Sequence, residues 1–380
     1  MTAIPGAPKI AHLGTALPFW ISLGLVPLAV LVANLGGWWI LLLPLSTWYL
    51  FTGLDYFIGL NTKNPDLDTP EEQLFWYKLI TLLWGPIQLA TIFGLMIYVV
   101  QTDHLNRVEE WALFAGLGIL SGTVGITYAH ELMHQKPKAE RWMADILMAS
   151  VLYSHFRSEH LLVHHRYVAT PRDPVTARYG ESFYRFFPRV LWQCWISAFN
   201  AEKAMLARKG LSWYHLSNPF WLYWALQVGF ILLAALIGGW WGVFLFSVQA
   251  FWAIFQLELV NYVEHYGLTR KHLGDGKYEH VQPRHSWNAA QRASNWLLIN
   301  LQRHSDHHYK PSRRFPLLQT YSADEAPQLP HGYPVMTMMA LVPSVWKRSM
   351  NPRVKAWRDQ HYPEIADWDA YKHGTNPLPR

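Results

Sequence analysis

Histidine is the residue type with the clearest chemistry in this 380-residue chain, because nine of its 19 histidines fall into four short groups. The groups read HELMH, HLLVHH, EHYG and HSDHH, and their histidines are His130, His134, His160, His164, His165, His265, His304, His307 and His308. Histidine is the commonest protein metal ligand, and neutral imidazole suits iron, zinc and copper. A tetrahedral metal takes four ligands, so nine grouped histidines predict a site for two metal ions.

The spacing within the groups predicts that their histidines share helix faces. Residues four apart stack on one face of a helix, so we expect His130 and His134 to point the same way, and likewise His160 and His164. The i, i+3, i+4 spacing of HSDHH again defines one face, whereas His165 is expected about 100° around its helix. Four helix ends are therefore expected to converge on one pocket.

Carboxylates lie beside these histidines and are candidates for orienting them. The four that adjoin a grouped histidine are Glu131, Glu159, Glu264 and Asp306. Metal-bound histidines usually donate their second ring N–H to a carboxylate or carbonyl, although solvated helix-end charges would look the same in sequence. Glu258 lies one to two turns before His265 in an apolar run, where an unpaired charge is costly. We expect Glu258 to face the interior near the metals.

The elements that must position these groups are long apolar segments. Hydrophobic residues make up 51% of the chain and charged residues 15%, against roughly 25% charged in soluble domains. Apolar runs occupy about 16–36, 38–59, 77–100, 111–130, 219–239 and 240–262. Each reaches the roughly 20 residues needed to cross the hydrocarbon core. The pattern predicts an all-α integral membrane protein with about six transmembrane helices.

The polar segments between and after the apolar runs predict a cytoplasmic helical cap that carries the histidine site. Segments 131–218 and 266–380 hold most of the 32 lysines and arginines, and the loops expected on the other side contain only Arg107. The positive-inside rule then places both segments in the cytoplasm, and six spans place both termini there. We expect tight turns at Gly36–Gly37 and Gly238–Gly239. Residues 1–380 are expected to form a single membrane domain.

A single cysteine, Cys194, limits the redox groups that this chain can hold. It excludes a disulfide within the chain and an internal iron–sulfur cluster, and no GxGxxG pattern indicates a dinucleotide domain. We expect no haem, flavin or NAD, so electrons for redox chemistry must come from another protein or domain. The basic cap suits anionic lipid or an acidic protein, whereas no recognition motif for nucleic acid accompanies the charge.

Two other functions compete at this point. HELMH matches HExxH, the motif of zinc metalloproteases in which a Glu acts as general base, so a membrane-embedded protease is an alternative. A protease needs one further ligand, however, and leaves most of the other seven grouped histidines unexplained. A metal transporter would place ligands near the bilayer midplane at broken spans, whereas these histidines gather at one face.

The motifs resemble those of a known family. HELMH, HLLVHH and LQRHSDHH after several spans look like the integral-membrane di-iron oxygenases and desaturases with histidine boxes. NYVEHYGL and LQRHSDHHYKP resemble segments specific to the alkane 1-monooxygenases (alkane ω-hydroxylases). The resemblance covers nearly the whole chain, including NTKNP after the second span and HSWN at 285–288, and all nine ligand positions of the family are filled.

The resemblance implies terminal hydroxylation of medium-chain n-alkanes. Alkane, dioxygen, two electrons and two protons would give a 1-alkanol and water at two non-haem iron ions held by the nine histidines. No side chain is then expected to act as a general base, and the protein supplies ligands, their supporting contacts and a dry channel. The alternative within the superfamily is a fatty-acyl desaturase or hydroxylase, which needs room for an acyl carrier or headgroup.

The resemblance also implies the partner and the location. Family members take electrons from rubredoxin, a small acidic iron protein that an NADH-dependent rubredoxin reductase reduces. Rubredoxin would be a separate protein or a domain fused after Tyr371. The implied location is the bacterial inner membrane, with several passes and the active site near the cytoplasmic face.

An alkane dissolves in the bilayer, so its channel is expected to run between spans toward the histidines. Thr123, Ile126 and Thr127 precede His130 by seven, four and three residues on the same helix face, and we expect them to line the channel. Trp48 lies about two turns before Asp55 on the second span and is a candidate stop that limits the chain length of the substrate. Packing or a place in the aromatic belt is the alternative for each of them.

Overall fold

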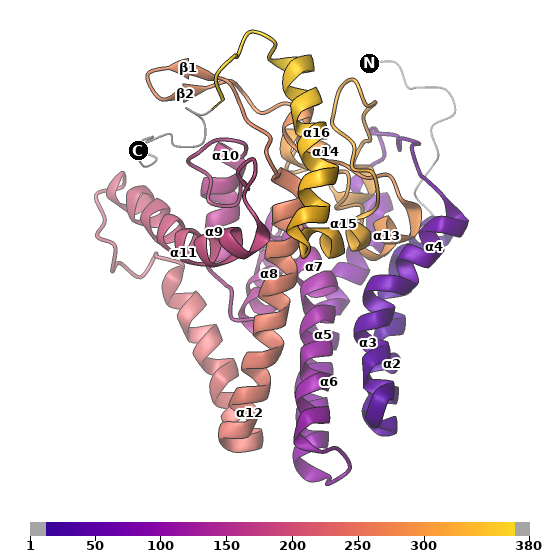
Figure 1. Cartoon of the computed structure of the whole chain (residues 1–380). Helices are drawn as coiled ribbons and strands as arrows, with labels where there is room; N and C mark the ends of the chain where they lie inside the picture. Colours follow the sequence, from indigo (N-terminus) through magenta and orange to yellow (C-terminus); the bar gives the residue numbers. More distant parts are fainter. Residues whose placement is uncertain (1–12, 369–380) are drawn as a thin grey trace.

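The chain folds into a bundle of long helices with a helical cap at one end (Figure 1). The computed structural model describes residues 13–368, so the expected fusion point after Tyr371 lies outside the described residues. Among these described residues, five helical stretches are long and apolar enough to cross a membrane: Leu13–Leu35, Gly37–Ile58, Glu71–Gln101, Arg107–Met133 and Phe220–His265. They agree with the predicted runs and make the chain a multi-pass membrane protein.

The first four stretches are built from shorter elements. They contain α1 (Leu13–Ala16), η1 (Leu17–Gly24) and α2 (Leu25–Leu35); η2 (Gly37–Leu41), α3 (Leu42–Leu45), η3 (Ser46–Leu50) and α4 (Phe51–Ile58); η4 (Glu71–Leu74) and α5 (Phe75–Gln101); and α6 (Arg107–Leu120), η5 (Ser121–Gly125) and α7 (Ile126–Met133). Two of these elements, η3 and η5, are π-helical turns. Such turns widen an α-helix locally and often occur at functional sites.

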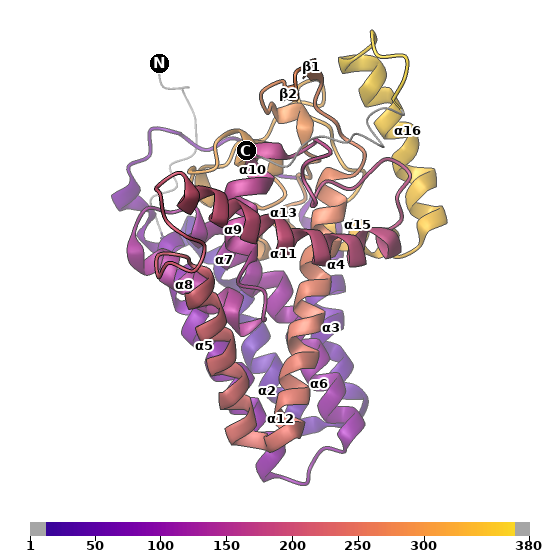
Figure 2. The same ribbon diagram turned by 90° about the vertical axis from the view of Figure 1, so that its left-hand side faces the viewer.

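The fifth stretch, α12 (Phe220–His265), is two spans joined by a reversal. A straight helix of 46 residues would be about 69 Å long, more than twice the hydrocarbon thickness. The backbone leaves the helical conformation at Gly238 and Gly239, and Gly239 has a φ of 57°, which glycine adopts without a steric penalty. Figure 2 shows the two arms meeting at this turn. They correspond to the predicted spans 219–239 and 240–262.

The cap consists of helices of different lengths and loops from both polar segments. Its elements are α8 (Lys138–Ser150), α9 (Phe156–Glu159), η6 (His160–His164), α10 (His165–Tyr167), α11 (Phe183–Ala207), η7 (Pro283–His285), α13 (Arg292–Leu297), α14 (His304–Tyr309), η8 (Phe315–Leu317), α15 (Tyr333–Ala340) and α16 (Pro343–His361). Within the described residues, the one sheet is an antiparallel pair of short strands, β1 (His272–Gly274) and β2 (Lys277–Tyr278). The predicted all-α class therefore holds.

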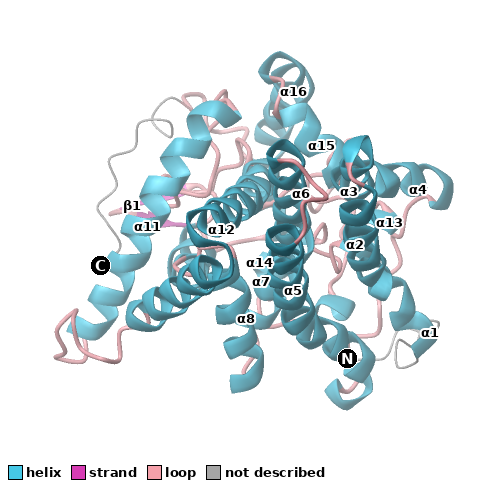
Figure 3. Cartoon of the chain, turned by 90° about the horizontal axis from the view of Figure 1, so that it is seen from below, coloured by secondary structure: helices cyan, strands magenta, loops and turns pink. Residues whose placement is uncertain are grey.

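Close packing of α6 and η5 against the second arm of α12 sets the position of the histidine site. A Cβ added at Gly122 would lie 2.6 Å from the Ala253 carbonyl oxygen, and Gly118 is equally crowded against the backbone at Gln249. Small residues allow membrane helices to approach this closely. Figure 3, seen from below the bundle, shows α6 beside α12. The ends of α7 and α12, which carry His130 and His265, are thereby brought together.

Candidate metal centre

All nine grouped histidines meet where the spans enter the cap, and they form two sets. The five-histidine set comprises His130, His134, His160, His165 and His307, and the four-histidine set comprises His164, His265, His304 and His308. In the first set, the Nε2 atoms of His134, His160 and His165 lie 2.9 to 3.1 Å from one another. In the second set, the Nε2 atom of His304 lies 3.0 Å from that of His308 and 3.1 Å from that of His265.

Hydrogen bonding cannot account for these distances. Each imidazole Nε2 carries either one hydrogen or one lone pair, so three mutually close Nε2 atoms cannot all be paired. Ligands about 2.0–2.1 Å from a metal ion, in contrast, lie roughly 2.8–3.4 Å from each other, the shorter values in octahedral and the longer in tetrahedral geometry. The chemistry of the donors therefore fits one metal ion in each set.

Burial keeps the cap histidines in the neutral form that binds metals. Removal from water lowers the pKa of His134 to about 3 and holds the pKa values of His160 and His308 well below the usual range, and neighbouring imidazoles add to the effect. With a depressed pKa, imidazole stays unprotonated at neutral pH. The lone pairs of these residues are then available to a metal ion.

The expectation that His160 and His164 point the same way is wrong. Residues 160–164 form the π-helix η6, which has a wider turn than an α-helix. A π-helix aligns residues five apart, so His160 shares its face with His165, and their Nε2 atoms lie 3.0 Å apart. His164 turns instead to the four-histidine set, where its Nε2 atom lies 3.2 Å from that of His308.

Helix α14 supplies both sets, so its three histidines do not share one direction as predicted. His304 and His308, four residues apart, belong to the four-histidine set. His307 lies between them in sequence and contributes to the five-histidine set, 3.1 Å from His165. Two ligand-bearing segments therefore divide their histidines between the sets: the continuous segment formed by η6 and α10, and the helix α14.

Of the five carboxylates predicted to orient ligands, only Glu264 lies close to an imidazole nitrogen within the described residues. Its Oε2 atom is 3.3 Å from the Nε2 atom of His304, which faces the proposed metal position. Glu258 accepts hydrogen bonds from Tyr153 at 2.8 Å and Asn261 at 3.1 Å, and it is fully buried, as its apolar surroundings predicted.

The other three predicted carboxylates have different surroundings. The Glu131 carboxylate accepts from Gln135 at 3.0 Å. Asp306 accepts from the Arg313 guanidinium and the Tyr321 hydroxyl. Neither Glu159 oxygen has a hydrogen-bond partner among the described residues, and burial raises the pKa of Glu159 well above its usual range, which favours the neutral acid.

Asp173 is a site residue that the sequence analysis missed. Its Oδ2 atom lies 2.9 Å from the Nδ1 atom of His164, and both side chains are buried. This contact leaves the Nε2 atom of His164 pointing toward the four-histidine set and fixes the orientation of the ring. Asp173 lies nine residues after His164 in a loop, so no helical spacing connects the two residues.

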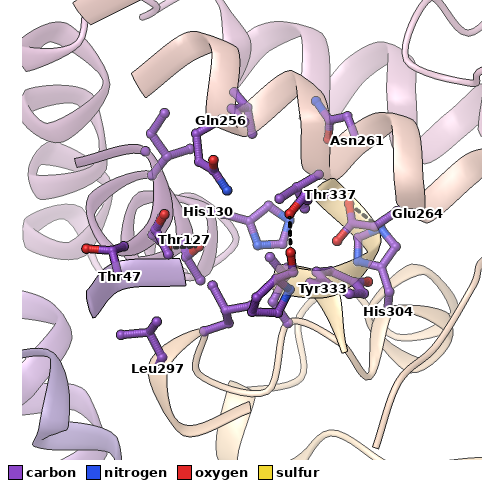
Figure 4. Close-up of a pocket in the computed structure, with 18 of the residues that line it drawn as sticks. Thr47, Thr127, His130, Gln256, Asn261, Glu264, Leu297, His304, Tyr333 and Thr337 are labelled. Carbon is purple, nitrogen blue, oxygen red and sulfur yellow. Dashed lines mark hydrogen bonds and ion pairs between the residues drawn. The ribbon is translucent and has the colours of Figure 1, made fainter. Parts of the chain in front are cut away.

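An apolar pocket opens onto both histidine sets. His130 and His160 of one set and His164 and His304 of the other line it, and Figure 4 shows His130 and His304 among the polar groups at this end. All four predicted channel residues, Trp48, Thr123, Ile126 and Thr127, also belong to its wall. The predicted channel residues and histidines of both sets therefore line the same pocket.

The pocket also has walls that the spacing argument did not include. Trp48 donates to the Gln256 side chain at 3.1 Å, which ties the second span to the second arm of α12 across the pocket. Tyr333 and Thr337 of α15 and Leu297 of α13 close the cap side (Figure 4). Tyr333 and Thr337 lie far from the histidine groups in sequence, and only the folded chain brings them to the site.

Comparison with known proteins agrees with the geometry. The fatty acid desaturase family model matches residues 109–340. Alkane 1-monooxygenase 2 of Alcanivorax borkumensis is 36% identical over 349 residues, covering 90% of this chain and 90% of the relative. Alkane 1-monooxygenase 2 of Pseudomonas aeruginosa is 36% identical over 351 residues, with 92% and 90% covered, and alkane 1-monooxygenase of Ectopseudomonas oleovorans is 38% identical over 347 residues, with 89% and 85% covered.

Proposed function

The chain belongs to the alkane 1-monooxygenase family, and from that premise we propose that it hydroxylates the terminal carbon of medium-chain n-alkanes. In the reaction, one oxygen atom of O2 enters the terminal C–H bond and the other leaves as water, and two electrons and two protons are consumed. The observation that carries the proposal is the apolar pocket, because histidines of both sets line it and one substrate chain there would meet both.

The metals proposed for the site are two non-haem iron ions, one for each histidine set. Bound ferrous iron supplies the reduction of O2 that cleavage of a strong terminal C–H bond requires, which no amino-acid side chain can supply. The nine histidines would hold the two ions, and Asp173 would keep His164 oriented. We assign no general base among the side chains.

The pocket residues would orient the substrate and exclude water. Thr123, Ile126 and Thr127 precede His130 on the same wall, so the reacting end of the chain would lie against this wall. The Trp48–Gln256 contact would limit how far the other end extends. Apolar walls release water when the alkane enters, which favours binding of a substrate that carries no polar handle.

The zinc protease alternative needs Glu131 as its base. The Glu131 carboxylate instead accepts from Gln135 and lies 3.9 Å from Arg314, and Glu131 is not part of the pocket wall. A substrate in the pocket would therefore not meet this carboxylate. The position of Glu131 favours the monooxygenase.

We propose rubredoxin, separate or fused, as the electron donor, reduced in turn by an NADH-dependent reductase. An exposed cation closely follows a ligand on three different segments: Lys136 after His134, Arg166 after His165, and Lys310 after His308. Two of these ligands, His134 and His165, belong to the five-histidine set, and the cations would attract an acidic carrier protein. With the cap on the cytoplasmic side of the bacterial inner membrane, this surface faces the compartment that contains NADH.

Product analysis tests the function. The purified protein in lipid nanodiscs would receive octane, O2, rubredoxin, rubredoxin reductase and NADH, and we expect 1-octanol in proportion to the NADH consumed. The His265→Ala variant is the control and should form none. Conversion of a fatty acyl chain to an alkene, with octane left unchanged, would replace the proposal with the desaturase alternative.

A further inference from the structure

Helix α11 differs from the other cap helices because it carries a row of exposed aromatic side chains. Tyr184, Trp192 and Trp195 are 59%, 66% and 42% exposed. At 100° per residue, these side chains fall on one side of the helix together with Pro188 and Phe199. We call Tyr184, Pro188, Trp192, Trp195 and Phe199 the aromatic stripe. Figure 2 shows α11 running across the ends of the spans instead of parallel to them.

The other faces of α11 have different surroundings. Phe186, Val190 and Cys194 are fully buried against the rest of the cap and the second arm of α12. Arg185 and Gln193 are exposed on the remaining side, about 100° and 180° around the helix from Tyr184. The helix is therefore amphipathic in three sectors: a packed face, a polar face and the stripe between them.

Contacts at both edges of the stripe show which way it faces. Phe187 packs against Phe255 with ring centroids 5.3 Å apart, and Phe255 lies in the membrane-spanning part of the second arm of α12. At the other end, Phe199 packs against Phe220 at 5.2 Å, where the first arm of α12 begins. Because both neighbours belong to the spans, the stripe faces the hydrocarbon side of the helix.

The charges beside the stripe fit a membrane surface. Arg185, Lys203, Arg208 and Lys209 are exposed along α11 and just after it. In the following loop, Trp213 and Tyr214 are also exposed. Aromatic side chains are enriched at the level of lipid headgroups, and lysine and arginine beside them reach toward lipid phosphates.

We propose that α11 lies in the headgroup region of the membrane, with the aromatic stripe inserted at its boundary with the acyl chains. Amphipathic helices with an aromatic apolar face and a basic polar face bind membranes in this way. The occupant of the stripe is then the phospholipid leaflet that surrounds the spans, and the cap is held to the bilayer by this helix as well as by the spans.

Hydrogen bonds link α11, and with it the proposed membrane contact, to the segment that carries ligands of the metal centre. The Ser158 hydroxyl donates to Glu202 of α11 at 2.6 Å and lies 2.9 Å from the Tyr223 hydroxyl in the first arm of α12. Ser158 comes two residues before His160, at the start of the segment that contributes His160, His164 and His165. A helix seated in lipid therefore supports the segment that contributes to both histidine sets.

Accessibility of a spin label tests the proposal. In a Cys194→Ala background, a nitroxide is attached at Trp192→Cys on the stripe or at Gln193→Cys, its exposed neighbour on the polar face. The protein is placed in nanodiscs of phosphatidylcholine and phosphatidylglycerol. We expect the label at 192 to collide with O2 on the order of fivefold more than with a water-soluble nickel chelate, and the label at 193 to show the reverse.

Equal accessibility of the labels at 192 and 193 to the nickel chelate would overturn the proposal. So would low collision rates with both reagents at 192, because they indicate a covering protein surface. A third contrary result is a label at 193, but not at 192, that collides more with O2 than with the nickel chelate. If Trp192→Cys fails to fold, Tyr184→Cys with its neighbour Arg185→Cys gives a second matched pair. The readout requires neither alkane nor electron donor, so the membrane contact and the proposed function can fail independently.

Discussion

The five-histidine set and the four-histidine set use the same ligand type in different surroundings. In the four-histidine set, every imidazole is buried, Asp173 contacts His164 and Glu264 lies beside His304. In the five-histidine set, His130, His134 and His165 are partly exposed, and three exposed cations lie close by in sequence. The four-histidine set is therefore the enclosed set and the five-histidine set is the open set, and we propose that electrons arrive beside the open set.

Removal of single ligands should give the largest effects and should separate the two sites. His265→Ala leaves three histidines in the enclosed set, so we expect loss of one metal ion per chain and at least about a 10²-fold loss of hydroxylation. His165→Ala leaves four histidines in the other set, so we expect a comparable loss of activity with most of the metal retained. Metal content and octanol formation are measured on the same preparations, and equal metal loss in both variants would contradict the unequal sets.

Asp173 should matter for the enclosed site alone. Asp173→Asn removes the anionic acceptor of His164, and we expect metal affinity at one of the two sites to fall about 10–100-fold. Glu258→Gln is the matched control, because Glu258 contacts Tyr153 and Asn261 and no imidazole nitrogen. Competition with a chelator measures both. If the two variants lose metal equally, the Asp173–His164 contact has no special role.

Charge reversal tests whether electrons arrive beside the open set. The triple variant Lys136→Glu, Arg166→Glu, Lys310→Glu should raise the KM for reduced rubredoxin about tenfold, and salt should weaken the wild-type interaction. The charge-preserving variant Lys136→Arg, Arg166→Lys, Lys310→Arg should behave as wild type. An unchanged KM in the reversed variant would move electron entry to another surface while leaving the metal sites as described.

The smallest effect is expected at the end of the pocket that both sets share. Trp48→Ser removes the indole that donates to Gln256, so longer alkanes should fit, with a several-fold shift of the product distribution and unchanged metal content. Competition among alkanes of increasing length gives the measurement. A distribution identical to wild type would assign Trp48 to packing between the spans.

Local patterns in the sequence predicted the spans, the cap and the identity of the grouped histidines, because apolar length and i, i+4 spacing are local properties. They did not predict how the histidines divide. That division depends on the π-helix at 160–164, which moves His164 away from His160 and aligns His165 with it. Whether a segment is assumed to be an α-helix or a π-helix therefore decides which of its histidines the spacing places on the same face.

Contacts between segments far apart in the chain also could not be predicted from the sequence. Asp173 reaches His164 from a loop, and Tyr333 and Thr337 reach the pocket from α15. Adjacency to a ligand was a poor guide to the supporting carboxylates, since Asp306 adjoins His307 yet pairs with Arg313. A carboxylate next to a ligand in sequence points away from the metal as readily as toward it, because neighbouring side chains on a helix diverge by about 100°.

The metal content of the purified wild-type protein tests the proposal that each histidine set holds one iron ion. Iron and zinc are quantified per chain by mass spectrometry after purification in nanodiscs. We expect about two iron atoms per chain, one for each set, and no stoichiometric zinc. A single zinc ion per chain, with no iron, would contradict it.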